Sequence, residues 1–175
     1  MERQRAHEEF GAARCKVFAG RKKLLKTIAA STGTRGTRAS QRPLVVVGGG
    51  GSGKSALLAR AAQERRRECE GTASVIMERY IGGVPGTESL MVTLTDLIAD
   101  LAKAYEQPEP PRPESTQQMT EAFEQALQYA TAERPLYLYL DALDQLSSAD
   151  GAWVLDWLPQ QLPPYAKVVV TVRSG

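Results

Sequence analysis

Apolar residues in this chain occur in two patterns, short continuous runs and longer segments with helical spacing. Continuous runs predict strands at 44–47, 136–140 and 167–172, and the segment 74–81 is predicted as a further strand. The run 44–47 has no alternation, so we expect it to be buried on both faces of a sheet. Helical spacing predicts helices at 22–30, 54–68, 90–104, 115–133 and 150–158. Strands that alternate with helices favour an α/β fold with an open, mostly parallel sheet.

The chain of 175 residues is long enough for one domain with its own core. Residues 1–15 are mostly polar, and we expect them to form a lead segment in which 2–10 is a short helix or disordered. Residues 16–175 are predicted to form the domain core. Parallel sheets bind ligands beyond the carboxyl ends of their strands. Gly48, Asp141 and Arg173 all lie at predicted strand ends, so they point to one shared site.

A glycine-rich segment, GGGGSGKS, connects the first predicted strand to the following helix. A flexible linker has this composition too, but it would explain neither the flanking valines nor the closing Lys-Ser pair. The segment matches the phosphate-binding pattern G-x-x-x-x-G-K-[ST], in which backbone N–H groups and the helix N-terminus bind the anion. Lys54 would reach the outer phosphates, and Ser55 would bind Mg²⁺. The candidate phosphate-binding residues are Gly48, Gly49, Gly50, Gly51, Ser52, Gly53, Lys54 and Ser55.

Charged residues follow the third and fourth predicted strands, in LYLYLDALDQL and VVVTVRSG. Asp141 would hold Mg²⁺ through water, together with Ser55. Asp144 would orient or deprotonate an attacking water, and its alternative reading is a helix cap or an exposed loop acid. Arg173 would face the terminal phosphate and stabilise developing charge, and its alternative reading is a frayed terminal residue. The predicted catalytic residues are therefore Lys54, Asp144 and Arg173, and the predicted metal-binding residues are Ser55 and Asp141.

Composition excludes several classes of function. The net charge of +2 is too small to indicate nucleic-acid binding, and the absence of asparagine excludes an N-K-x-D element for guanine. Cys15 and Cys69 are distant in sequence and His7 is the only histidine, which argues against a zinc site. No apolar run is long enough to span a membrane, and the charged N-terminus does not resemble a signal peptide. We therefore expect a cytoplasmic location, with the nucleus as an alternative.

Several segments resemble the nucleotide-binding domain of STAND-class NTPases, in particular the NACHT type. The first four are KVFAGRKKLLKTI, GGGGSGKS, LYLYLDALDQL and VVVTVRS. Two more, RYIGGVPGTESLMVTLTDLIADL and WVLDWLPQQLPPYAKVVVTV, are similar to the telomerase protein component and nephrocystin-like members. The resemblance implies a P-loop NTPase three-layer sandwich that binds ATP or ADP with Mg²⁺. It also implies that Phe18 and Arg21 lie near the nucleotide, where the residues alone would suggest a helix entry and a surface charge.

The same resemblance implies a slow ATP-hydrolysing switch within a larger signalling or scaffold protein. Because the family continues into a helical lid, a winged helix and partner-binding repeats, we expect this chain to be a fragment truncated after the fourth core strand. Protein partners would then bind through the missing domains. Two alternatives remain open. One is an interaction module that holds ADP without hydrolysing ATP, and the other is a nucleic-acid-associated AAA+-like ATPase, which Arg35, Arg38 and Arg42 motivate.

Overall fold

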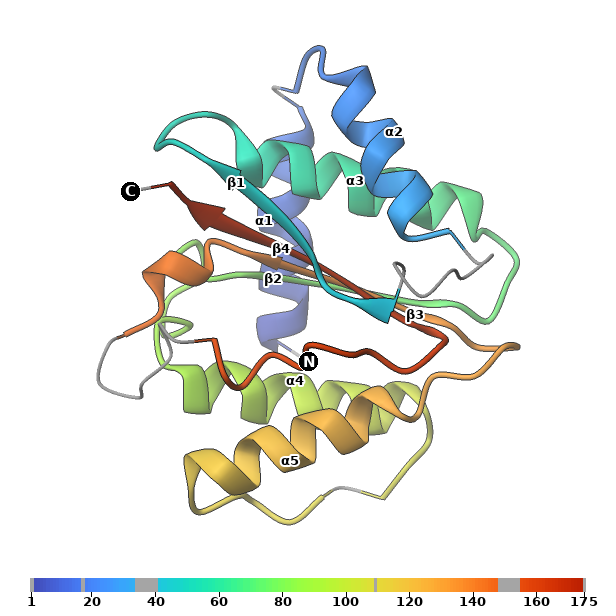
Figure 1. Cartoon of the computed structure of the whole chain (residues 1–175), viewed down its shortest axis with the longest axis vertical. Helices are drawn as coiled ribbons and strands as arrows, with labels where there is room; N and C mark the ends of the chain where they lie inside the picture. Colours follow the sequence, from blue (N-terminus) through green and yellow to red (C-terminus); the bar gives the residue numbers. More distant parts are fainter. Residues whose placement is uncertain (1, 17, 34–40, 109, 148–154, 175) are drawn as a thin grey trace.

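A parallel sheet forms the centre of the computed structural model, which describes residues 2–16, 18–33, 41–108, 110–147 and 155–174 (Figure 1). Its four strands are β1 (Leu44–Gly48), β2 (Val75–Tyr80), β3 (Leu136–Asp141) and β4 (Ala166–Arg173). They are ordered β1-β4-β3-β2, and every neighbouring pair is parallel. The fold is therefore α/β, as predicted. The order also places β4 between the glycine-rich loop strand and the Asp141 strand.

Helices cover both faces of this sheet (Figure 1). On one face lie α2 (Lys22–Ser31) and α3 (Lys54–Glu68), and on the other lie α4 (Leu90–Ala104) and α5 (Thr116–Leu127). The side chains of β3 alternate between the two layers. Leu138 and its even-numbered neighbours join the core under α4 and α5, whereas Tyr137 and Tyr139 join the core under α2 and α3. A central strand that contributes to both cores explains why β3 is buried along its whole length.

The strand β1 departs from the expectation that it is buried on both faces. Leu44 and Val46 pack against the core under α2 and α3, but Val45 and Val47 are 47% and 60% exposed. The reason is its place at the sheet edge, because β4 is its one strand neighbour among the described residues. The apolar run was therefore a correct signal for a strand and a wrong signal for burial.

Two predicted helices end differently in the structure. The helix predicted over 115–133 ends at Leu127, because Thr131 and Arg134 form a hydrogen-bonded turn that leads into β3. Residues 155–158 of the helix predicted over 150–158 form a turn, in which Leu155 has a φ of 56° that no α-helix accommodates. The rest of that prediction, with Trp153, lies outside the described residues. Trp157 is buried against Phe123, as expected for a core tryptophan.

A further helix, α1 (Glu2–Cys15), crosses the β2 edge of the sheet (Figure 1). The sequence prediction left residues 2–10 open between a short helix and a disordered lead, and the helix is present and longer. It lies against α3 and β2. The imidazole of His7 is 1% exposed, and its Nδ1 accepts a hydrogen bond of 3.0 Å from the backbone N–H of Tyr80. This contact satisfies a backbone donor on the outer edge of β2, where no strand pairs with it among the described residues.

No helix within the described ranges combines the length and the apolar character needed to cross a lipid bilayer.

The buried His7 predicts an acid-sensitive structure. Burial is the largest of the effects that lower the pKa of His7 from 6.5 to about 4. The positive charges of Arg79 in β2 and Arg3 in α1 act in the same direction, and the negative charge of Asp96 in α4 opposes them. The folded protein therefore binds fewer protons than the unfolded chain between these two pKa values. The contribution of neutral His7 to the free energy of unfolding is complete above pH 6.5 and is lost as pH falls towards 4.

We expect parent protein to lose up to about 2 kcal/mol of unfolding free energy from this group between pH 7.5 and pH 5. The variant His7→Gln keeps an acceptor for Tyr80 but does not titrate, so its loss over the same range should be smaller. Urea denaturation of both proteins at both pH values measures the difference. An equal loss in the two proteins would contradict the role assigned to His7.

Candidate functional site

The glycine-rich segment forms a tight loop between β1 and the N-terminus of α3. Gly51 and Gly53 have φ values of +67° and +78°, which residues other than glycine rarely adopt. At Gly48, a Cβ would come within 3.0 Å of Ser52 Oγ, so the loop also folds closely on itself. Gly53 is the N-cap residue of α3, which begins at Lys54. The backbone amides of the loop therefore meet the positive end of the helix dipole in one place.

Lys54 folds over this loop and brings its charge to the loop mouth. Its Nζ donates hydrogen bonds of 2.6 and 3.0 Å to the carbonyl oxygens of Gly48 and Gly49. Ser52 Oγ is buried and has no hydrogen-bond partner among the described residues. A buried hydroxyl without a partner is costly unless something else bonds to it. The loop therefore offers an ammonium group, an unpaired hydroxyl and backbone amides to an anion.

Ser55 connects the loop to the acid at the end of β3. Its hydroxyl interacts with the carboxyl group of Asp141, which is 3% exposed, and acts to lower the pKa of that group. Thr171 of β4 donates a 2.6 Å hydrogen bond to Asp141 Oδ1, and its oxygen accepts one of 2.8 Å from the backbone N–H of Ala142. Burial raises the pKa of Asp141, against the hydrogen bonds from Ser55 and Thr171 and the charge of Lys54. One helix, α3, and two strands, β3 and β4, thus meet at one carboxyl group.

The oxygen atoms of Ser55 and Asp141 are the kind that Mg²⁺ prefers. Within the described ranges, no group of three or more His, Cys, Asp or Glu side chains is arranged to hold a metal ion. A protein site with few ligands suits Mg²⁺ in phosphate-binding loops, because phosphate oxygens and water complete its coordination. Ser55 and Asp141 therefore fit Mg²⁺ that arrives with a nucleotide better than a metal held by protein alone.

Asp144 and Arg173 also meet at this edge of the sheet. Asp144 lies in the short 3₁₀ helix η2 (Leu143–Gln145), and its Oδ1 accepts a 2.9 Å hydrogen bond from the backbone N–H of Arg173. The guanidinium of Arg173 lies over the loop, where a Cβ at Gly50 would be 3.4 Å from its Cζ. Arg173 therefore belongs to a paired strand, contrary to the frayed-end alternative, and it faces the loop.

The two residues of the F-x-G-R segment occupy different places. The Arg21 guanidinium donates a hydrogen bond to the carbonyl oxygen of Ser52, so it contacts the loop directly. A Cβ at Gly53 would be 3.4 Å from Arg21 Nη2, so the arginine also lies against the start of α3. Phe18 instead packs against the core under α2 and α3. The structure thus brings Arg21 to the other predicted residues, while the contact of Phe18 with adenine stays a prediction.

Sequence reasoning missed one residue of this site. This residue is Thr171 of β4, to which the sequence analysis assigned no role. Its signal was present, because it is the one hydroxyl within the apolar run VVVTV. A polar side chain inside a central strand needs a buried partner. The partner, Asp141, became evident only from the strand order, since β3 and β4 are adjacent.

Comparison with known proteins agrees with this geometry. A family model described as "AAA ATPase domain" matches residues 17–171. The chain belongs to the AAA ATPase domain family. This P-loop ATPase domain is also 34% identical, over 97 residues, to "NACHT and WD repeat domain-containing protein 2" of Mus musculus, and 31% identical to the Homo sapiens protein of that name. The aligned residues are 55% of the chain and 6% of each relative, so the AAA ATPase domain corresponds to a small part of these proteins.

Among solved structures, the chain is similar to the structure of the Aeropyrum pernix ORC1 protein in complex with DNA. The sequence identity is 17% and the TM-score is 0.49. The similarity covers 93% of the AAA ATPase domain and 38% of the ORC1 chain.

We predict that the Thr171 hydroxyl stabilises the fold through Asp141. Thr171→Val keeps the side-chain shape but removes one donor from the buried carboxyl group and leaves the Ala142 N–H without its acceptor. Each loss costs about 1–3 kcal/mol in a buried site. Urea denaturation should therefore show a marked loss in Thr171→Val and little loss in Thr171→Ser, which keeps the hydroxyl. Equal stability of the valine variant and the parent would contradict this interpretation.

Proposed function

We propose that this AAA ATPase domain binds ATP with Mg²⁺, hydrolyses it slowly, and acts as a nucleotide-dependent switch in a larger signalling or scaffold protein. The observation that carries the proposal is that Ser55, beside the phosphate-binding loop, interacts with the buried carboxyl group of Asp141 at the end of β3. These residues are 86 positions apart in sequence and belong to different elements. Their contact joins the phosphate-binding loop to the acid that such a site needs for its metal ion.

Each residue at the loop has a role that follows from its chemistry. The loop amides, Ser52 Oγ and Lys54 would bind the phosphates of the nucleotide. Ser55 and Asp141 would hold Mg²⁺, which neutralises negative charge on the phosphates when it is bound. Arg21 contacts the loop backbone at Ser52, so it would fix the loop shape on the side where the F-x-G-R segment enters.

Asp144 and Arg173 would act on the reacting phosphate. Asp144 is exposed at the carboxyl end of β3, where it can orient a water molecule and accept its proton. Arg173 would stabilise negative charge that develops during hydrolysis. The hydrogen bond from the Arg173 backbone to Asp144 keeps the acid and the arginine in fixed relation. A productive geometry for the water therefore depends on both strand ends together.

Slow hydrolysis is supported by the exposure of this edge. Asp144 and Arg173 are both exposed, so water screens the charges that would stabilise the transition state. Slow turnover gives each nucleotide state a long lifetime, which suits a switch. The similarity to NACHT and WD repeat domain-containing protein 2 supports the same role, because the name of that protein combines a NACHT domain with WD repeats.

Nucleotide binding should stabilise the folded domain. We expect Mg²⁺–ATP or Mg²⁺–ADP at about 100 times its Kd to raise the Tm by about 5 °C or more, and Mg²⁺–GTP to raise it less. The matched variant Lys54→Ala lacks the ammonium group and should lose the shift, whatever its own Tm. Thermal melting followed by circular dichroism measures both. No shift with any adenine nucleotide in the parent would reject the proposed site.

Hydrolysis should depend on Asp144 without a matching loss of binding. Asp144→Asn keeps the oxygen that accepts from the Arg173 backbone but cannot take a proton. We expect ATP turnover to fall by about 10²-fold or more, with nucleotide affinity nearly unchanged. Asp156→Asn, at an exposed position away from the loop, is the matched control. Parent turnover no higher than that of Lys54→Ala, despite tight binding, would instead indicate a module that holds nucleotide without hydrolysing it.

A further inference from the structure

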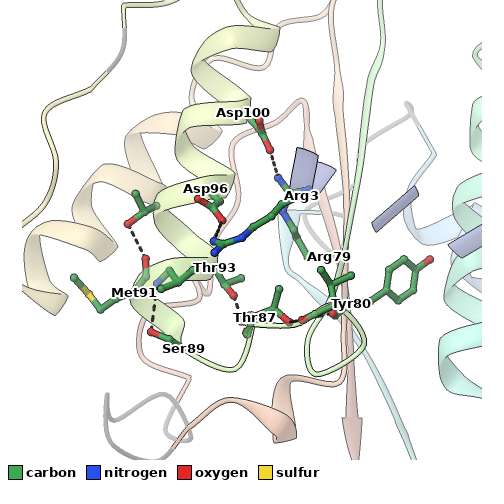
Figure 2. A network of polar contacts seen from close by, with 12 residues as sticks. Arg3, Arg79, Tyr80, Thr87, Ser89, Met91, Thr93, Asp96 and Asp100 are labelled. Atoms are coloured by element: carbon green, nitrogen blue, oxygen red, sulfur yellow. Dashed lines mark hydrogen bonds and ion pairs between the residues drawn. The ribbon is translucent and has the colours of Figure 1, made fainter. Parts of the chain in front are cut away.

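The helix α1 is attached to the sheet edge mainly by polar contacts. Of its described side chains and glycines, only His7 and Gly11 are buried. Arg3 forms an ion pair with Asp96 of α4, and Gln4 accepts a hydrogen bond from Arg79 of β2, which itself pairs with Asp100 of α4 (Figure 2). A helix that buries so little apolar surface is held weakly, so it belongs to the least stable part of the structure.

Gly11 marks the closest approach of α1 to the sheet. A Cβ at this position would lie 2.6 Å from Glu78 Oε2 and 2.7 Å from Tyr80 Oη. These atoms cannot move aside easily, because Glu78 and Tyr80 are 2% and 0% exposed and are hydrogen-bonded to each other. Glu78 is also held by an ion pair with Arg66 of α3. Glycine is a poor helix former, so its use in mid-helix reflects this contact.

The same helix contacts the loop that follows β2. The ring of Phe10 packs on Tyr80, with ring centroids 4.9 Å apart. It also lies directly on Gly83, where a Cβ would be 2.7 Å from Phe10 Cζ. We name residues 81–89 the β2–α4 loop. Its position is therefore set on one side by α1.

On its other side, the β2–α4 loop contacts the segment that carries Asp144. The side-chain oxygen of Gln145 lies against Gly82, in the space that a Cβ there would occupy. The backbone N–H of Ser147 donates a 2.7 Å hydrogen bond to the carbonyl oxygen of Glu88. We name residues 142–147 the Asp144 loop. An unbroken series of contacts thus runs from Phe10, through Gly83 and Gly82, to Gln145 and Asp144.

We propose that α1 is a releasable clamp that orders the Asp144 loop through the β2–α4 loop, with Gln145 as the positioning residue between them. When α1 is docked, the β2–α4 loop is held and Gln145 keeps Asp144 at the end of β3. When α1 leaves the sheet edge, both loops lose that support, and Asp144 is held less firmly although its hydrogen bond from the Arg173 backbone remains. The catalytic consequence rests on the proposed function, because it concerns the turnover of ATP and leaves the phosphate-binding loop intact.

This arrangement gives regulation a definite physical form. The clamp has two discrete states, docked and released, and the contacts with Phe10 exist only in the first. Release would be favoured by any partner or segment that binds α1 more tightly than the sheet edge does. The side chains nearest to the glycines of the phosphate-binding loop are those of Ser52, Lys54, Arg173 and Arg21, none of which belongs to α1. Nucleotide affinity should therefore respond little to release, whereas turnover should fall.

The test compares two substitutions in the whole chain. Gly11→Leu places a side chain against Glu78 and Tyr80 and should release α1. Ala13→Leu, at an exposed position of the same helix, is the matched control. Amide hydrogen exchange followed by mass spectrometry should show faster exchange, by about tenfold or more, in 2–15, 81–89 and 142–147 in Gly11→Leu alone. Circular dichroism establishes that each variant is folded.

A second variant interrupts the series of contacts at its far end. Gln145 is exposed, and the variant Gln145→Ala changes no residue of α1. The amides of residues 142–147 should therefore exchange faster, while those of residues 2–15 keep their protection. Unchanged exchange of 142–147 in Gly11→Leu or in Gln145→Ala would overturn the clamp. Continued protection of 2–15 in Gly11→Leu would overturn it as well, because the close approach at Gly11 would then not hold the helix.

Kinetics separate this proposal from the proposed function. Gly11→Leu and Gln145→Ala should each reduce kcat for ATP by about tenfold, with the Kd for Mg²⁺–ATP within about twofold of the parent value. A parent protein that neither binds nor hydrolyses nucleotide would reject the proposed function. The exchange data would still decide whether α1 orders the Asp144 loop. Faster exchange of 142–147 with an unchanged kcat would overturn the catalytic part of the clamp.

Discussion

The buried carboxyl group of Asp141 is the constraint on which the candidate site depends. An ionisable group in the interior is unfavourable unless hydrogen bonds compensate for the lost solvent. Here the compensation comes from Ser55 at the start of α3 and Thr171 in β4. Any displacement of α3, β3 or β4 would remove a donor from this carboxyl group. The requirement to satisfy one acid therefore aligns three elements, and the loop, Asp144 and Arg173 follow from that alignment.

Local sequence patterns were sufficient to predict several helices and strands and most residues of the candidate site. The spacing of Leu90, Leu94 and Leu97 predicted α4 with the bounds that the structure has, and the glycine motif with its flanks predicted the turn into α3. The residues at strand ends were predicted as one group because parallel strands bring their carboxyl ends to one edge. The AAA ATPase family match agrees with that reading of the fold.

Features that depend on the strand order or on close approach of two backbone segments could not be predicted from the sequence. The exposure of Val45 follows from the edge position of β1, which no run of apolar residues reveals. The place of α1 depends on contacts of His7 and Gly11 with β2, about 70 residues away, in a helix with almost no apolar face. Thr171 could be assigned to the site only when β4 was known to adjoin β3. Side-chain pattern carries little information about such long-range neighbours.

The strand order has a consequence for how the domain folds. β4 comes last among the described strands in sequence, yet it lies between β1 and β3. Until residues 166–173 are synthesised and inserted, β1 has no strand partner among the described residues and Asp141 lacks Thr171. Such non-local pairing slows folding, because long segments of chain must be closed before the contacts form. The candidate site is therefore complete only when β4 has paired with both β1 and β3.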